Sequence, residues 1–251
     1  MTTISTNYLR VDNKVFYCNG MTTSLDDAET HTHKIQKITK QEVALHHNDT
    51  TPEERALEIM IKMVLGILGV SYAVASEKKS KEKKLIDTAI GVSSACLVAS
   101  ALQDYAEIQE QKNRSAKELA GKAITYLKRN PLSHVTFVFH SQGTDIGQRA
   151  LHHLHNLKER IHVVTIGGMV SISNELAHRV VNFQNIEDLV SKGAQGFFDW
   201  EAGVRTRVAT KNRSCETSFC HGSVDYLRHG SVKDALYDLS RPKFYHVVRR
   251  S

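Results

Sequence analysis

The stretch from Val135 to Gly143, VTFVFHSQG, constrains the fold of this chain more than any other segment. Its first six residues are rich in β-branched and aromatic side chains and predict a buried strand. Ser141 follows that run, and a helical pattern starts near Thr144. A strand, a serine and a helix in immediate succession predict a sharp turn that lifts the serine hydroxyl off the carboxyl edge of a sheet.

Strands and helices are predicted to alternate along the rest of the chain. Short β-branched runs predict strands at residues 14–18, 43–45, 161–166, 180–183 and 204–209. Helices are predicted between them, including one capped by Ser24, with Asp27 in the place of a capping-box acid, and one over 112–129. This alternation predicts a single α/β domain over 1–251, with a mainly parallel, doubly wound sheet covered by helices on both faces.

Residues 53–112 do not fit a minimal sheet. Two segments without charged residues, 63–76 and 88–102, flank the lysine-rich run from Lys78 to Lys84. The pattern predicts an apolar helical hairpin inserted into the domain. Each arm is shorter than the ~20 apolar residues that cross a bilayer. The alternatives are a helical pair packed on the domain, a lid or membrane-dipping hairpin, and a two-pass anchor.

Charge and cysteine content exclude several classes of protein. The net charge of +6 favours anionic partners, and the run from Lys78 to Lys84 would suit an anionic membrane surface. No nucleic-acid partner is expected, because no basic motif is interleaved with aromatic residues. The N-terminal residues MTTIST lack a basic flank and an apolar core, so no secretory signal is expected. A cytoplasmic location with four free thiols is the simplest expectation.

A serine hydroxyl needs partners before it can act as a nucleophile. A histidine must accept its proton, an acid must orient that histidine, and donors must hold the oxyanion that forms. In a doubly wound sheet these groups come from loops beyond the carboxyl ends of the strands. Asp188 follows the strand 180–183 and is the candidate acid, with Glu187 as the alternative. His221 follows the last predicted strand and is the candidate base, with His229 as the alternative.

Two backbone N–H groups are candidates for the oxyanion hole. One belongs to Gln142, at the start of the helix that follows the serine. The other belongs to Met21 or Thr22, in the loop after the first strand, where Asn19 and Gly20 permit a tight bend. Loss of one such donor typically lowers turnover by about 10²–10³-fold.

Some of these candidate residues also have explanations other than a role in hydrolysis. Asp188 would also suit the N-terminus of a helix, where the dipole favours an acid. A zinc site is a weaker alternative and no cofactor or metal is expected, because Cys-x4-Cys-His is not a standard ligand spacing. The residues of that alternative would be Cys215, Cys220, His221 and His229.

The motif from His140 to Gly143, with Ser141, Asp188 and His221 in that order, resembles the α/β-hydrolases of the lipase and esterase type. Residues 17–21 and 24–28, taken with this motif, are similar to uncharacterised hydrolase-like proteins of chlamydiae. The resemblance spans residues 12–50 and 113–240. It implies an acyl-ester hydrolase fold, with no known substrate.

One position departs from that family's pattern. The turn calls for a small residue two positions before the serine, and Phe139 stands there. Two functions are therefore expected as alternatives. The first is a serine hydrolase of carboxylic esters, with lipid or other apolar acyl esters suggested by the apolar hairpin. The second is a catalytically weak or inactive hydrolase-fold protein that binds a membrane surface or a partner through residues 55–112.

Overall fold

The computed structural model describes residues 5–20, 23–49, 81–185, 188, 206–209 and 223–249. The chain divides into two compact units. The first combines Met1–Asp49 with Ser115–Ser251, and the second is Thr50–Arg114. All of the candidate site residues belong to the first unit.

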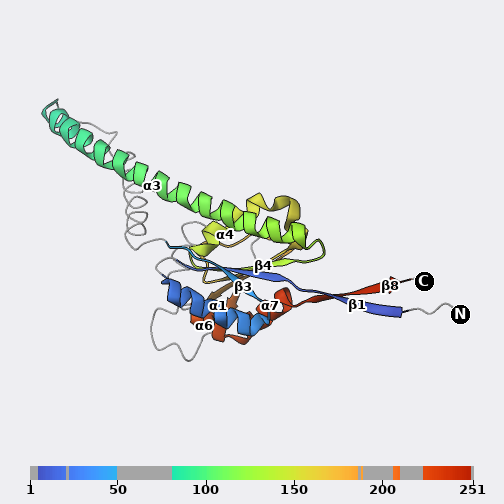
Figure 1. Cartoon of the computed structure of the whole chain (residues 1–251). Helices are drawn as coiled ribbons and strands as arrows, with labels where there is room; N and C mark the ends of the chain where they lie inside the picture. Colours follow the sequence, from blue (N-terminus) through green and yellow to red (C-terminus); the bar gives the residue numbers. More distant parts are fainter. Residues whose placement is uncertain are drawn as a thin grey trace. The chain divides into compact units, whose positions relative to one another are not determined.

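A parallel sheet forms the centre of the first unit (Figure 1). In the described part of the chain six strands pair in the order β3-β2-β4-β5-β6-β7, and each pairing is parallel. The strands are β2 (Lys14–Cys18), β3 (Val43–His46), β4 (Val135–His140), β5 (Ile161–Ile166), β6 (Arg179–Asn185) and β7 (Thr206–Ala209). The predicted α/β class with a mainly parallel sheet is confirmed.

Helices cover both faces of this sheet, so its central strands are buried on both sides and are rich in apolar residues (Figure 1). All six residues of β4 and all six of β5 are buried. One face packs against α4 (Gly143–His153) and the end of α3 (Lys81–Arg129). The other face packs against α1 (Leu25–Thr39), α6 (Ser223–Arg228) and α7 (Gly230–Ser240). A short 3-10 helix, η1 (His155–Arg160), links α4 to β5.

Helix α3 is a single helix of 49 residues where two elements were predicted. It joins the second apolar segment, 88–102, to the predicted helix over 112–129. No proline lies between Lys81 and Arg129, and Pro131 follows the helix end, so nothing in the sequence interrupts its backbone hydrogen bonds. The first apolar segment, 63–76, lies outside the described residues. None of the helices in the described ranges is long and apolar enough to span a membrane.

A second sheet, which was not predicted, pairs segments near the two ends of the chain. Strand β1 (Ser5–Val11) runs antiparallel to β8 (Lys243–Arg249), with Ser5 opposite Arg249 and Val11 opposite Lys243. Residues more than 230 positions apart in the sequence therefore lie side by side. Local patterns carry little information about such a pairing.

The predicted cap of α1 is present. The Ser24 hydroxyl accepts a hydrogen bond from the Asp27 backbone N–H at 3.1 Å and donates one to the Asp27 carboxylate at 2.7 Å. The helix ends at Thr39, and the capping residue Lys40 has a left-handed φ of 55°. This cap fixes where the loop after β2 turns into α1.

The strand order places a topological switch point, here termed the crevice, between the ends of β2 and β4. From β2 the chain moves to β3 on one side, and it later returns to β4 on the other side. At such a switch point the loops leave the carboxyl edge in opposite directions, and ligands bind between them. Cys18 ends β2 and His140 ends β4, so the loop at Asn19 and the turn at Ser141 border this crevice.

Candidate active site

Ser141 has a left-handed backbone conformation, with a φ of 52°. It stands between the end of β4 and the start of α4. A residue with a Cβ atom adopts this conformation at a cost of about 1–3 kcal/mol, and such strain is concentrated at functional sites. The predicted sharp turn between strand and helix is therefore present at the serine.

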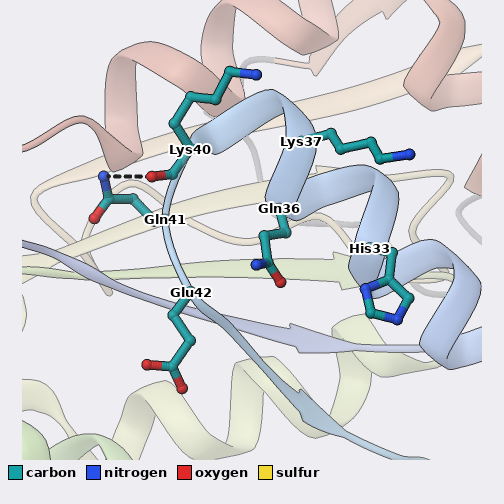
Figure 2. Close-up of a pocket in the computed structure, with 6 residues that line it drawn as sticks. All are labelled: His33, Gln36, Lys37, Lys40, Gln41 and Glu42. Carbon is teal, nitrogen blue, oxygen red and sulfur yellow. Dashed lines mark hydrogen bonds between the residues drawn. The ribbon is translucent and has the colours of Figure 1, made fainter.

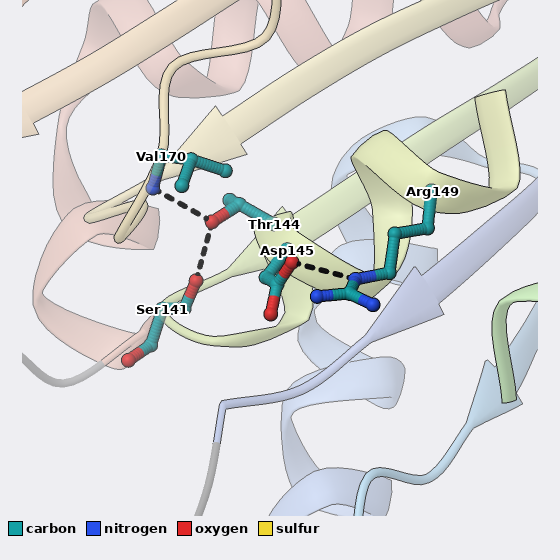
Figure 3. A network of polar contacts seen from close by, with 5 residues as sticks. All are labelled: Ser141, Thr144, Asp145, Arg149 and Val170. Atoms are coloured by element: carbon teal, nitrogen blue, oxygen red, sulfur yellow. Dashed lines mark hydrogen bonds and ion pairs between the residues drawn. The ribbon is translucent and has the colours of Figure 1, made fainter. Parts of the chain in front are cut away.

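Hydrogen bonds to the Ser141 carbonyl hold this turn (Figure 3). The Thr144 hydroxyl donates to that carbonyl at 2.6 Å and accepts hydrogen bonds from the N–H groups of Met169 and Val170 at 3.1 and 3.2 Å. The N–H groups of Thr144 and Met169 also donate to the carbonyl. Figure 3 shows the Ser141 hydroxyl on the opposite side of the residue from this bonded carbonyl. Thr144 thus ties the turn to the loop after β5, and its role was not predicted.

The loop after β2 lies directly against Ser141. A Cβ atom built at Gly20 would lie 2.7 Å from the Ser141 Cβ and 3.3 Å from its Oγ. A Cβ atom at Gly143 would lie 2.6 Å from the Cys18 carbonyl oxygen. These positions admit no side chain, so the glycines bring the two sides of the crevice into contact.

Phe139 does not prevent the turn. Its ring is fully buried and stacks on Phe137, with ring centroids 5.4 Å apart. A Cβ atom at Gly147 would lie 2.5 Å from the Phe139 ring, so the ring occupies the space that a side chain at position 147 would need. The bulk that the hydrolase pattern excludes at position 139 is therefore accommodated by a glycine one turn into α4.

Asp188 is fully buried and has a defined partner. The Tyr226 hydroxyl, on α6, donates a 2.6 Å hydrogen bond to Asp188 Oδ2. A carboxylate removed from water needs such donors, and this length is typical of a hydroxyl bonded to a carboxylate. No pattern in the sequence pairs Tyr226 with Asp188.

Asp188 and Ser141 lie on either side of the end of β5. Oδ2 of Asp188 lies 2.9 Å from the position of a Cβ atom at Gly167, the residue that follows β5. The Ser141 N–H donates to the carbonyl of Ile166, the last residue of β5. Asp188 and Ser141 therefore lie at the same edge of the sheet, as expected for residues that follow the carboxyl ends of parallel strands.

Four of the residues predicted for the site lie outside the described residues: Met21, Thr22, Glu187 and His221. Gln142 is described, and no backbone carbonyl among the described residues accepts a hydrogen bond from its N–H. His229 precedes α7, and its backbone N–H donates to Tyr226. None of the hydrogen bonds within the described ranges joins His229 to Ser141 or Asp188.

Burial makes Cys18 a poor alternative nucleophile. The thiol is fully buried at the end of β2, and burial raises its pKa from 9.0 to about 12. A thiol reacts as the thiolate, so Cys18 is inert near neutral pH. Burial also raises the pKa of the neighbouring Tyr17, and the nearby Ser223 side chain opposes part of that shift. Ser223 begins α6, so this contact places the start of that helix beside β2.

A separate hollow of about 710 Å³ lies at the end of α1 (Figure 2). Glu42, one of its lining residues, directly precedes β3, so the hollow lies at the amino edge of the parallel sheet. Ser141 lies at the carboxyl edge, and the hollow is therefore no part of the candidate site. Its lining residues are His33, Gln36, Lys37, Lys40, Gln41 and Glu42.

Neither a protein-family model nor a curated protein matches this chain.

Proposed function

We propose that this protein is a serine hydrolase of the α/β-hydrolase type that cleaves carboxylic esters. The observation that carries this proposal is the left-handed φ of 52° at Ser141, between a central parallel strand and a helix. Structural turns with a positive φ usually contain glycine, asparagine or aspartate. A strained serine at the switch point of a parallel sheet is the arrangement that exposes a nucleophile in this class of enzyme.

In the proposed mechanism Ser141 Oγ attacks the ester carbonyl. His221 accepts the serine proton and then donates it to the leaving alcohol, and Asp188 orients the imidazole. Water then repeats the sequence to release the acid and restore Ser141 Oγ–H. The backbone N–H groups of Gln142 and Met21 hold the negative oxygen of the tetrahedral intermediate.

Chain connectivity supports the choice of His221. It lies two residues before Ser223, which is buried beside Tyr17. Two residues span at most about 7 Å. Tyr226, one turn into the same helix, reaches Asp188. The start of helix α6, which follows position 221 in the sequence, thus lies near both the acid and the end of β2.

The preference for apolar acyl groups rests on the sequence. The uncharged segments 63–76 and 88–102 would supply an apolar surface for an acyl chain, and the run from Lys78 to Lys84 would face anionic headgroups. Hydrolysis of p-nitrophenyl butyrate and p-nitrophenyl laurate compares short and long chains directly. We expect the longer chain to be cleaved with the higher kcat/KM.

Labelling with a fluorophosphonate probe tests the nucleophile. The wild-type protein is expected to react covalently, while Ser141→Ala does not. Ser133→Ala is the matched control. Ser133 is a buried serine just before the amino end of β4, away from Ser141, and its hydroxyl donates to the Asp12 carbonyl. His221→Ala and His229→Ala distinguish the two candidate bases. Equal labelling of folded wild type and Ser141→Ala would overturn the proposal.

A further inference from the structure

Three buried amide side chains connect the two sides of the crevice. Asn19 follows β2, Asn48 follows β3, and Gln142 follows Ser141. Their exposed fractions are 0%, 5% and 0%. Buried amides are costly unless hydrogen bonds compensate for the loss of water, so their hydrogen-bond partners reveal what they hold in place.

The Asn19 side chain joins the end of β3 to the loop beside Ser141. Its Nδ2 donates to the Asn48 carbonyl at 3.0 Å, and its Oδ1 accepts from the Asn48 N–H at 2.8 Å. Parallel pairing of β2 with β3 ends at Cys18 and His46, so this amide extends the ladder beyond the strands. Nδ2 also donates to the Gly20 carbonyl at 2.8 Å, and Gly20 is the residue in contact with Ser141.

The Asn48 side chain continues the connection to the other side of the crevice. Its Nδ2 donates to Gln142 Oε1 at 3.0 Å. Gln142 Nε2 is buried without a hydrogen-bond partner in the described part of the chain, so Asn48 provides the hydrogen bond that fixes this side chain. A buried donor without an acceptor costs about 1–3 kcal/mol, and each such group calls for an explanation.

We propose that Asn48 is a positioning residue for the oxyanion hole. Through Asn19 it links the loop after β2 to Gln142, whose backbone N–H is a candidate oxyanion donor. The proposal rests on the serine hydrolase function proposed above. Amides suit this task because they are uncharged, whereas a carboxylate at the same place would repel the negative oxygen of the intermediate.

Small displacements are sufficient for a large effect. Oxyanion donors act only when they lie 2.7–3.1 Å from the developing negative oxygen. A misplacement of about 1 Å can lower the rate about 100-fold. Asn48→Ala removes the bond to Gln142 but keeps the backbone groups that bind Asn19. We therefore expect kcat for p-nitrophenyl butyrate to fall about 10-fold or more, with KM changed less than about 2-fold.

The affinity for a trifluoromethyl ketone separates positioning from general stability. Such a ketone forms a tetrahedral adduct with the serine, and its oxygen occupies the oxyanion hole. Asn48→Ala should weaken this affinity by the same factor by which it lowers kcat/KM. Asn13→Ala is the control, because Asn13 is a buried amide at the amino end of β2 that donates to the carbonyls of Ser240 and Arg241. Asn13→Ala should lower Tm and leave both the affinity for the ketone and kcat/KM unchanged.

A double-mutant cycle with Gln142→Met tests whether Asn48 acts through Gln142. Each single variant and the double variant should lower kcat by the same factor, because either change breaks the same bond. Independent, multiplying effects would contradict the proposal. If Asn48→Ala does not fold, Gln142→Met alone decides: a lowered kcat with an unchanged KM supports the proposal, and an unchanged kcat overturns it.

The outcomes distinguish the two proposals. Absence of serine-dependent hydrolysis in the wild type would overturn both the hydrolase function and the role of Asn48. Serine-dependent hydrolysis in the wild type, with Asn48→Ala indistinguishable from Asn13→Ala, would overturn the role of Asn48 alone.

Discussion

At Ser141 the backbone conformation that presents the hydroxyl is one that destabilises the folded chain. The residue has a φ of 52°, and its carbonyl is held by the Thr144 hydroxyl and by the N–H groups of Thr144 and Met169. Asp188 accepts a hydrogen bond from the Tyr226 hydroxyl. Each of these two candidate catalytic residues is thus bonded to a residue from another part of the chain, Ser141 to Met169 and Asp188 to Tyr226. Substitutions of these residues and of their hydrogen-bond partners should affect stability and reactivity by different amounts.

Replacing Ser141 by glycine should stabilise the protein while removing its reactivity. Glycine adopts a positive φ without steric cost, so Ser141→Gly should be more stable than Ser141→Ala by about 1 kcal/mol. Urea unfolding of the two variants measures the difference. Both should fail to react with a fluorophosphonate. Equal stability of the two variants would mean that the turn carries no strain in solution.

Removing the Thr144 hydroxyl should loosen the turn. Thr144→Val keeps the shape but leaves the Val170 N–H without its acceptor, at a cost of about 1–3 kcal/mol, and leaves the Met169 N–H with the Ser141 carbonyl alone. We expect a lower Tm and slower phosphonylation of Ser141. Thr144→Ser retains the hydroxyl and should preserve the labelling rate. Fast labelling of a folded Thr144→Val variant would show that the clamp is dispensable.

Removing the Tyr226 hydroxyl should weaken the hold on the acid. Tyr226→Phe keeps the ring but removes one hydrogen bond to the buried Asp188, which costs about 1.5–3 kcal/mol for a hydrogen bond to a charged group. Both the free energy of unfolding and kcat should fall. Tyr237→Phe is the control, since Tyr237 is a half-exposed tyrosine on α7. A stable variant with unchanged kcat would indicate that Asp188 does not orient the base.

At the scale of an element, α4 depends on close contact with the sheet. Its glycines bring it against Cys18 at one point and against the Phe139 ring at the other. An aromatic row of Phe16, Phe137 and Phe139 fills the space beneath the helix, with centroid separations of 5.7 and 5.4 Å. The helix therefore approaches the sheet closely only because position 147 has no side chain.

Gly147→Ala should force α4 away from β4. The added Cβ would lie 2.5 Å from the Phe139 ring, and overpacking of this kind typically costs about 1–3 kcal/mol. Gly121→Ala is the matched control on α3, where nothing lies within 4 Å of the added atom. It should raise stability by about 0.5–1 kcal/mol through helix propensity. Phe139→Leu combined with Gly147→Ala should recover part of the loss, as chemical denaturation would reveal.

For the molecule as a whole, the strand order brings the loops after β2, β4 and β6 to one edge of a covered sheet. Both faces of that sheet are buried. An ionisable group enclosed there has a different pKa in the folded and unfolded states, so the stability of the fold depends on pH. Cys18 illustrates this link, because it is enclosed at the end of β2 and its thiol pKa is raised from 9.0 to about 12.

Stability should fall as the pH rises above 9, in part because of Cys18. The thiol ionises near pH 9 when the chain is unfolded but only near 12 when it is folded, so its contribution is complete below pH 9 and is lost between 9 and 12. The slope attributable to this group is at most about 1.4 kcal/mol per pH unit. Cys18→Ala should flatten the dependence of the free energy of unfolding on pH. The same slope in both proteins would show that this thiol is not buried.

Some features of this fold follow from local patterns and were predicted. The strand–turn–helix at Ser141 follows from a β-branched run, a serine and a glycine in succession. The cap at Ser24 follows from the spacing to Asp27. The positions of β2 to β7 follow from short apolar runs. Neighbouring residues create these signals through backbone preferences and the period of side chains along an element, so a single sequence contains them.

Contacts between distant residues were decided by the tertiary structure. Tyr226 reaches Asp188 across 38 positions, Asn48 reaches Gln142 across 94, and β1 meets β8 from the two ends of the chain. Gly147 accommodates the Phe139 ring that the sequence pattern alone marked as an obstacle. Each of these contacts depends on strand order and on the packing of helices against the sheet, which bring together residues that no local pattern connects.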